Sequence, residues 1–224
     1  MQPDSLWHIV GFTVGVCALS TLFILPPGVL LGLVLARGRF PGRALLETVL
    51  SLPLVLPPVA TGLVLLRQTG PNGWLGAWFE RTTGLEIAFT WRAVVVATGV
   101  MAFPLLLRSA RVAFQEVPPR LEPVARTLGA SEWRVFFTVT LPLARRGLIS
   151  GIVLAFARAL GEFGATILVA GNIPGKTTTL SLAIYQAVQT GNDAMASRLI
   201  LVSAALAFAA LWASDVLQRQ RHLL

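Results

Sequence analysis

Cysteine, histidine and lysine are nearly missing from this sequence of 224 residues. There are one cysteine and two histidines, and all but one of the 18 basic residues are arginine. Cys17 has no second cysteine to pair with, and His8 and His222 stand at opposite ends. No group of residues has the spacing of metal ligands. These shortages exclude a disulfide scaffold and a zinc site, and we expect no metal or other cofactor.

Charged residues are also scarce. They make up 12% of the chain, against about a quarter in a typical soluble domain, while 55% of the residues are hydrophobic. The net charge of +8 comes from arginines scattered in short groups, without the basic stripe that follows a phosphate backbone. The composition therefore favours the lipid bilayer as the surroundings of this chain and predicts no nucleic-acid partner.

Sequence motifs of catalysis are missing as well. The chain has no Gly-x4-Gly-Lys-Ser/Thr loop for phosphate, no His-Glu-x2-His metalloprotease motif and no Gly-x-Ser-x-Gly elbow. We therefore expect no catalytic residues. Any ATP chemistry would have to come from another subunit.

Long apolar runs are what the sequence does have. A helix needs about 20 residues to cross about 30 Å of hydrocarbon. Runs of this length lie near 9–35, 45–66, 93–115, 147–170 and 197–217. They predict an all-α fold, a polytopic transmembrane bundle of five spans, or six if residues 73–82 form a further membrane helix. The first run follows Asp4 and no basic residue, which is not the pattern of a signal peptide, so a retained helix is expected.

Prolines and glycines occur within these apolar runs. Prolines inside the first two spans are tolerated where neighbouring helices satisfy the freed backbone groups. The pairs Gly28/Gly32 and Gly147/Gly151 have the small-xxx-small spacing that lets helices approach closely.

The arginines predict an orientation. One side of the predicted bundle carries Arg37, Arg39, Arg43, Arg108, Arg111, Arg120, Arg126, Arg134, Arg145, Arg146, Arg219 and Arg221. The other side carries only Arg67, Arg81, Arg92, Lys176 and Arg198. By the positive-inside rule the N-terminus is outside, the C-terminus is cytoplasmic, and residues 116–146 form a cytoplasmic loop.

The 116–146 segment is too regular for a simple linker. Pro118 and Pro119 redirect the chain, Glu122 suits the first turn of a short helix, and Gly129 can end that helix. A second, amphipathic helix is expected from Glu132 to Thr140, ended by Pro142, with Trp133 and Phe137 contacting the bundle. Such a rigid knob can bind a partner, but the same geometry fits an interfacial loop without one.

Several stretches resemble a known family. Gly129, nine residues, then Val139-x-Leu141-Pro142 resembles the cytoplasmic signature of ABC importer permeases, Glu-Ala-Ala-x3-Gly-x9-Ile-x-Leu-Pro. Glu122 stands one residue earlier than in that pattern, and only Ala125 of the two alanines is kept. The stretches LPLVLPPVATG (52–62), ARTLGASEWRVFFTVTLP (125–142), LAFARALGEFGATI (154–167) and GNIPGKTTTLSLAIY (171–185) resemble the molybdate and sulfate branch of this family.

The resemblance implies much about function. It implies a type I ABC importer permease fold in one domain, residues 1–224, located in the inner membrane. It also implies a homodimer with the ion path between the subunits, two cytoplasmic ATPase subunits and a periplasmic molybdate-binding protein. Contact with the ATPase would be made by Glu122, Ala125, Leu128, Gly129, Ala130 and Ser131. The transported oxyanion would be molybdate, with sulfate, thiosulfate and tungstate as alternatives.

The fourth run contains two charges, which are costly inside a membrane. Arg158 and Glu162 are four residues apart and can pair on one helix face. The pair either neutralises itself as a structural element or borders the ion path as a gate, with the Thr166 hydroxyl as a candidate donor to the ion. Two other classes remain open, a stand-alone secondary transporter or channel and an intramembrane enzyme. No inverted repeat supports the first, and no catalytic group supports the second.

Overall fold

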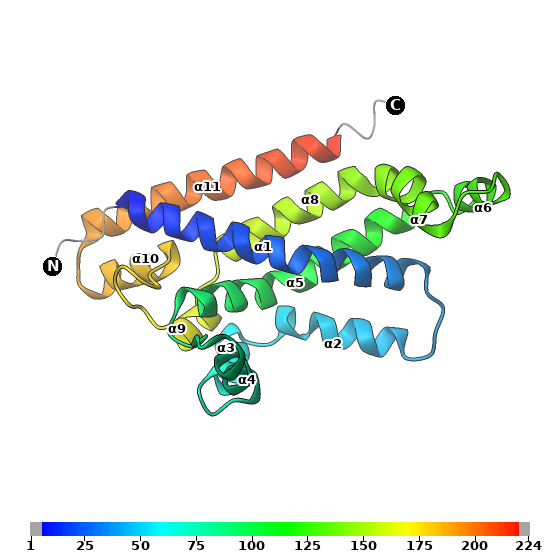
Figure 1. Ribbon diagram of the computed structural model, residues 1–224. Coiled ribbons are helices and arrows are strands. Elements are labelled where there is room, and N and C mark those ends of the chain that lie inside the picture. The colour runs from blue at the N-terminus through cyan, green and yellow to red at the C-terminus, as the bar shows by residue number, and fades with distance from the viewer. Residues whose placement is uncertain (1–5, 220–224) are drawn as a thin grey trace.

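A computed structural model describes residues 6–219, and the part it describes is helical, without strands. Asp4, Arg221 and His222 lie outside these residues, and so do the expectations that rest on them. The long helices are α1 (Leu6–Arg37), α5 (Trp91–Gln115), α8 (Leu141–Leu160) and α11 (Asp193–Arg219). They run side by side along the length of the bundle, with α5 packed against α1 and α8 (Figure 1). The all-α membrane bundle predicted from the apolar runs is confirmed.

Glycines set the distance between these helices. A Cβ added at Gly32 of α1 would stand 2.7 Å from the Cβ of Ala110, and one at Gly28 would stand 2.8 Å from Leu106 Cδ2, both on α5. On α8, a Cβ at Gly151 would stand 2.6 Å from Ser109 Cβ. Real Cβ atoms do not approach so closely, so the close packing predicted for Gly28, Gly32 and Gly151 is confirmed.

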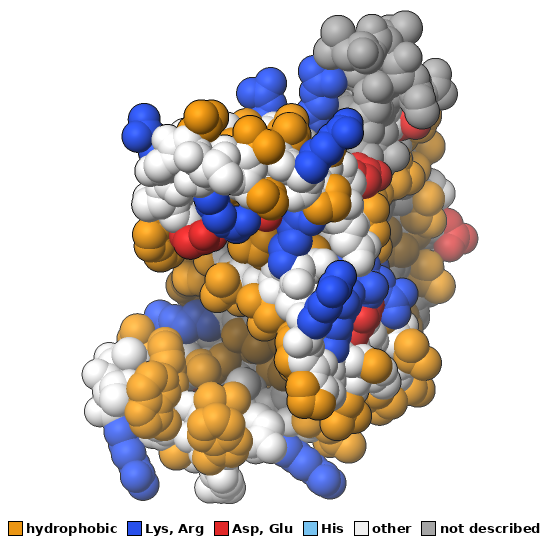
Figure 2. Space-filling view, turned by 90° about the vertical axis from the view of Figure 1, so that its right-hand side faces the viewer, with side chains coloured by type: hydrophobic (Ala, Val, Ile, Leu, Met, Phe, Trp, Pro, Cys, Tyr) orange, Lys and Arg blue, Asp and Glu red, His pale blue; other side chains and the backbone are white. Residues whose placement is uncertain are grey.

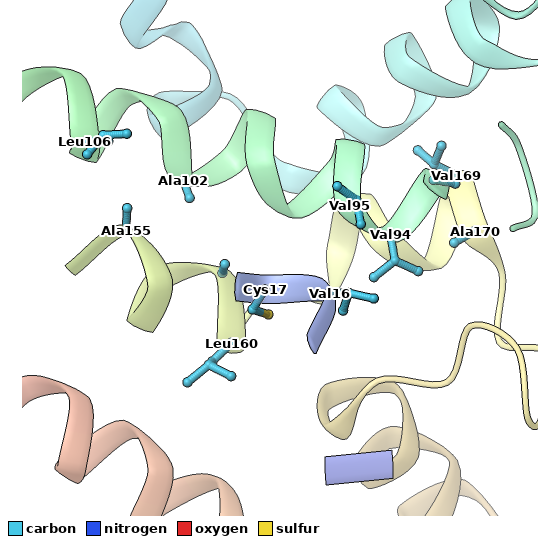
Figure 3. Close-up of a cluster of buried hydrophobic side chains, with 12 residues drawn as sticks. Val16, Cys17, Val94, Val95, Ala102, Leu106, Ala155, Leu160, Val169 and Ala170 are labelled. Atoms are coloured by element: carbon cyan, nitrogen blue, oxygen red, sulfur yellow. The ribbon is translucent and has the colours of Figure 1, made fainter. Parts of the chain in front are cut away.

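The main core lies where four helices meet. Val16 and Cys17 of α1 face Val94 of α5, Leu160 of α8 and Val169 of α9 (Gly164–Ala170), as Figure 3 shows. Small side chains at the crossing points, such as Ala102 and Ala155, let the helices approach one another. The core therefore fixes α9, a short helix, to the long ones.

The second predicted span is not one helix. It is split into α2 (Arg43–Val55) and α3 (Pro58–Thr69), which meet at 108°. Pro57 and Pro58 have no N–H, so the helical hydrogen bonds at this point are lost and the chain turns. The span predicted over 45–66 is therefore two helices with a sharp bend, and it is one span only if the pair is counted together. A helix near 73–82 is confirmed as α4 (Trp74–Thr83), but with 10 residues it is too short to cross a membrane.

The fourth predicted span begins and ends earlier than expected. After α6 (Leu121–Thr127), one helix runs through α7 (Glu132–Val135), the π-helical turn η1 (Phe136–Thr140) and α8. The wider hydrogen bonding of a π-turn accommodates a residue without an N–H, so the chain passes Pro142 without a break, contrary to our prediction. The helix ends at Leu160, and residues 164–170 form the separate α9.

Within residues 6–219, four helices are thus long and apolar enough to cross a membrane, and there are five candidate spans if the bent α2–α3 pair counts as one. The short helices α3, α4, α9 and α10 (Leu180–Gln189) gather at one end of the bundle, and α6 and α7 project from the other (Figure 1).

Candidate functional site

The turn between α6 and α7 is built on a left-handed glycine. Gly129 has φ of 83° and ends α6, and the N–H of Ala130 donates to the carbonyl of Ala125 at 3.1 Å. Ser131 then begins α7 by accepting a hydrogen bond from the N–H of Arg134 at 3.4 Å. The predicted helix end at Gly129 is confirmed. The two helices form a compact projection, because glycine adopts this backbone conformation without strain.

Glu122 holds this projection to the bundle. Its side chain is only 14% exposed, and Oε1 accepts hydrogen bonds from Arg37 Nη2 at 2.8 Å and from Thr140 Oγ1 at 3.0 Å. These contacts tie α6 to the end of α1 and to η1. The structure therefore turns Glu122 inward, towards its own chain.

A second ion pair closes the turn. Arg126 donates from Nε and Nη2 to the two carboxylate oxygens of Glu132, at 2.6 and 3.0 Å. The hydrogen bond from Arg126 lowers the pKa of Glu132. Both groups are exposed, so the pair adds little to the stability of the fold. Its two hydrogen bonds join the end of α6 to the start of α7 with a defined geometry.

The outer face of α6 is apolar and uncovered. Leu121, Val124 and Leu128 share this face at helical spacing, and Leu128 is 82% exposed. An exposed apolar patch of this kind marks an interaction surface. Figure 2, which views the end that carries α6 and α7, shows hydrophobic side chains among the many Lys and Arg side chains there. The geometry favours a partner-binding knob over an interfacial loop.

Trp133 and Phe137, on α7 and η1, are exposed as well. They are 75% and 57% exposed and stack on each other, with ring centroids 6.3 Å apart. The residues that contact the bundle are the buried Val135 and the partly buried Phe136, whose ring lies 6.5 Å from that of Phe114. We expected Trp133 and Phe137 to hold this helix against the bundle, and this was wrong. The helix has large apolar residues on two faces, and the face with Val135 and Phe136 is the one that packs on the bundle.

At the other end of α8, the structure brings Arg158 and Glu162 together. Arg158 Nη1 lies 2.9 Å from Glu162 Oε2, and the glutamate side chain is only 2% exposed. We had expected Glu162 to lie on the same helix as Arg158, but it lies in the turn that follows α8. From there its Oε1 also accepts a hydrogen bond from the N–H of Ala165 at 2.9 Å, in the first turn of α9. The carboxylate thus joins α8 to α9.

Thr166 lies one residue further along α9. It is fully buried, and its hydroxyl has no hydrogen-bond partner among residues 6–219. The neighbouring Gly164 packs on α3, where an added Cβ would stand 2.7 Å from Pro58 Cβ. The three predicted residues therefore cluster around the α8–α9 turn, against the bend of the second span.

Helices long enough to cross a membrane, joined to a compact projection with an exposed apolar face, define a membrane protein with a candidate binding surface at one end. Residues 28–222 match the family described as binding-protein-dependent transport system inner membrane component. The chain belongs to this family, which confirms the resemblance noted in the sequence. Membership sets aside the secondary transporter and the intramembrane enzyme, and it makes this chain a multi-pass membrane protein and a transport subunit.

Individual relatives narrow the comparison. The molybdenum transport system permease protein ModB of Escherichia coli is 49% identical over 217 residues, 96% of this chain and 95% of its own length. The sulfate transport system permease protein CysW of Synechocystis is 39% identical over 90% of this chain and 71% of its own length. An inward-facing MetNI methionine ABC transporter has the same fold, with a TM-score of 0.71 at 18% identity over 98% of this chain and 99% of that one.

Proposed function

We propose that this chain is the membrane-spanning subunit of an ATP-driven molybdate importer in the inner membrane. The observation that carries the proposal is the 49% identity to a molybdenum permease over nearly the whole of both chains. Sulfate permeases match at lower identity and over a smaller part of their own length, so sulfate is the second candidate. Thiosulfate and tungstate are related oxyanions that the same protein architecture could carry.

The proposed mechanism divides the work between subunits. Two copies of this chain enclose the ion path, and a periplasmic binding protein delivers molybdate to it. The exposed apolar face of α6, with Leu128 and the Gly129–Ser131 turn, fits into a groove of an ATPase subunit. Glu122 and Ala125 lie behind this face and hold it in place. ATP binding and hydrolysis in the partner move the projection, and α8 carries the movement to the α8–α9 turn.

Reconstituted transport tests this proposal. The chain is expressed together with a candidate ATPase subunit and a molybdate-binding protein from the same organism, purified as a complex and placed in vesicles. We expect molybdate uptake that requires ATP on the ATPase side and binding protein on the other side. A tenfold excess of sulfate should inhibit it little. Uptake that ignores ATP, or that prefers sulfate, would contradict the proposed function.

The proposed orientation places the N-terminus in the periplasm and the C-terminus and residues 116–146 in the cytoplasm. It can be tested with Ala130→Cys, because the native Cys17 is buried in the core and is shielded from a bulky reagent. An impermeant maleimide should label this variant in inside-out vesicles and leave it unlabelled in intact cells with a permeabilised outer membrane. Labelling in such cells would reverse the orientation.

A further inference from the structure

The central helix α5 has exposed side chains along one strip of its surface, in the half that lies near α6. In its first part, residues 93–104, no side chain is exposed, because α1, α8 and α9 cover it. Further along, Arg108 and Val112 are exposed between α2 on one side and α8 on the other. The strip therefore places a cation on the most buried helix of the bundle.

Arg108 differs from the other arginines around it. Arg37 pairs with Glu122, Arg111 with Glu47, and Arg126 with Glu132. Within residues 6–219, no hydrogen bond or ion pair engages the Arg108 guanidinium. An unpaired charge in a membrane helix is costly and marks a functional site by default. Arg108 lies seven residues before the end of α5, which is about 10 Å along the helix axis, so it stands within the span and not at its tip.

Two cavities meet at Arg108. One, of about 460 Å³, lies between α2 and α5 and is lined by Arg108 together with Thr48, Ser51 and Val55 of α2. The other, of about 350 Å³, lies between α5 and α8 and is lined by Arg108, Ser109 and Ser150, among others. Arg108 thus borders both cavities, and serine or threonine residues share both walls with it.

Ser51 is the most informative of these hydroxyl groups. The residue is buried and lines the larger cavity, yet its Oγ has no partner within the described part of the chain. A buried hydroxyl without a partner is costly, and such groups in native proteins are usually explained by water, an ion or a ligand. Thr48, one turn earlier, already donates its hydroxyl to the carbonyl of Ala44 at 2.8 Å, so Ser51 is the free donor.

The Glu47 carboxylate also borders this cavity, and Arg111 neutralises it. Glu116, in the wall of the smaller cavity, lies eight residues from Arg108, about 12 Å along the helix axis. The region around Arg108 therefore keeps a positive charge. An anion is the ligand that this charge attracts.

We propose that Arg108 and Ser51 form a binding site for a tetrahedral oxyanion on the cytoplasmic part of the ion path. The planar guanidinium offers paired N–H donors that match the oxygens of such an ion, and the serine hydroxyl offers a further donor. The proposal rests on the proposed function, and it adds the residues that meet the ion after it leaves the binding protein. Neither residue belongs to the Arg158–Glu162 cluster, which lies at the other end of α8.

Direct binding tests the site. Radiolabelled molybdate is added to the purified complex in detergent, without binding protein, and uptake is measured separately in vesicles. We expect Arg108→Gln to weaken binding at least tenfold and to lower uptake at least tenfold, with membrane yield and ATPase retention unchanged. Arg108→Lys should fall between, because an ammonium keeps the charge but loses the paired donors. Ser51→Ala should weaken binding about two- to fivefold.

Arg39→Gln is the matched control. Arg39 is exposed in the loop between α1 and α2 at the same end of the bundle, and its replacement removes the same charge without touching either cavity. It should bind and transport molybdate like the wild type. If Arg108→Gln fails to assemble, molybdate binding by Ser51→Ala becomes the test of the site. This change should not disturb folding, because the Ser51 hydroxyl makes no hydrogen bond within the described chain. Unchanged molybdate binding in Arg108→Gln, or in Ser51→Ala where that variant decides, would overturn the proposal.

The headgroup of an anionic phospholipid offers a tetrahedral oxyanion with a net negative charge, so uptake is compared in phosphatidylcholine vesicles with and without phosphatidylglycerol. A loss in Arg108→Gln that appears in both vesicles supports the transported ion as ligand. A loss confined to vesicles with phosphatidylglycerol would overturn that assignment and identify the headgroup of an anionic lipid. A wild-type complex that imports no molybdate would instead contradict the proposed function itself, which keeps the two failures apart.

Discussion

Replacing Glu162 with alanine is expected to be the most damaging single change in the membrane part of this chain. It leaves the Arg158 guanidinium without its partner and also removes the acceptor for the Ala165 N–H at the start of α9. Removing one partner of a buried pair costs about 3–5 kcal/mol. Arg158 is 28% exposed and can turn towards solvent, so we expect about 2–3 kcal/mol here. The loss should appear as a lower unfolding temperature in detergent and a lower membrane yield.

Two further variants separate the roles of Glu162. The double change Arg158→Ala/Glu162→Ala removes both charges and should be less damaging than Glu162→Ala, although the Ala165 N–H still lacks its acceptor. Glu162→Gln keeps an oxygen for that N–H and should also be milder than Glu162→Ala. If the double variant is as unstable as Glu162→Ala, the pair is not what stabilises the turn, and a separate role for Glu162 in transport would follow.

Gly129→Asp is expected to uncouple the transporter while leaving the chain folded. A Cβ at Gly129 would have no atom within 4 Å in its own chain, so there is room for the new side chain in the isolated subunit. The left-handed backbone costs a non-glycine residue about 1–2 kcal/mol. In the complex, the side chain would stand between the α6 face and the ATPase. We expect at least a tenfold loss of molybdate uptake, together with unchanged membrane yield and either release of the ATPase or ATP hydrolysis without transport.

Gly42→Asp provides the matched control. Gly42 has φ of 84°, lies in a loop at the same end of the bundle, and likewise has no atom within 4 Å of an added Cβ. Both variants pay the same backbone strain and add the same charge, but only Gly129 lies beside the exposed α6 face. Uptake by Gly42→Asp should stay within about twofold of the wild type, as expected when only local strain of this size is added. Equal uptake by both variants would contradict the proposed contact.

Hydropathy was sufficient to predict the long helices, because crossing a bilayer demands a long apolar run. It could not predict how prolines act, since that depends on the surrounding hydrogen bonds. Pro57 and Pro58 follow each other and bend the second span by 108°, whereas Pro142 follows a π-turn and leaves its helix continuous. The same residue type therefore breaks one helix and not another.

The candidate sites show a similar limit. Spacing predicted that Arg158 and Glu162 meet and that Gly129 ends a helix, because both are local relations. The direction of Trp133 and Phe137 was predicted wrongly, since an exposed apolar face has the same sequence pattern as a face that packs on the core. Arg108 was grouped with the loop arginines, and only the structure shows that it lies within α5, seven residues before the end of the helix, and beside two cavities.

The unbroken helix from Glu132 to Leu160 connects the projection rigidly to the opposite end of the bundle. With 29 residues it is about 44 Å long, so a tilt of about 5° at one end displaces the other by about 4 Å. One end carries the exposed aromatic pair beside the α6 turn, and the other reaches the turn in which Glu162 joins α8 to α9. A displacement of that size exceeds the reach of a hydrogen bond, so a small rocking of the projection would be enough to shift the α8–α9 turn, with Glu162 in it, against the bend of the second span on which Gly164 packs.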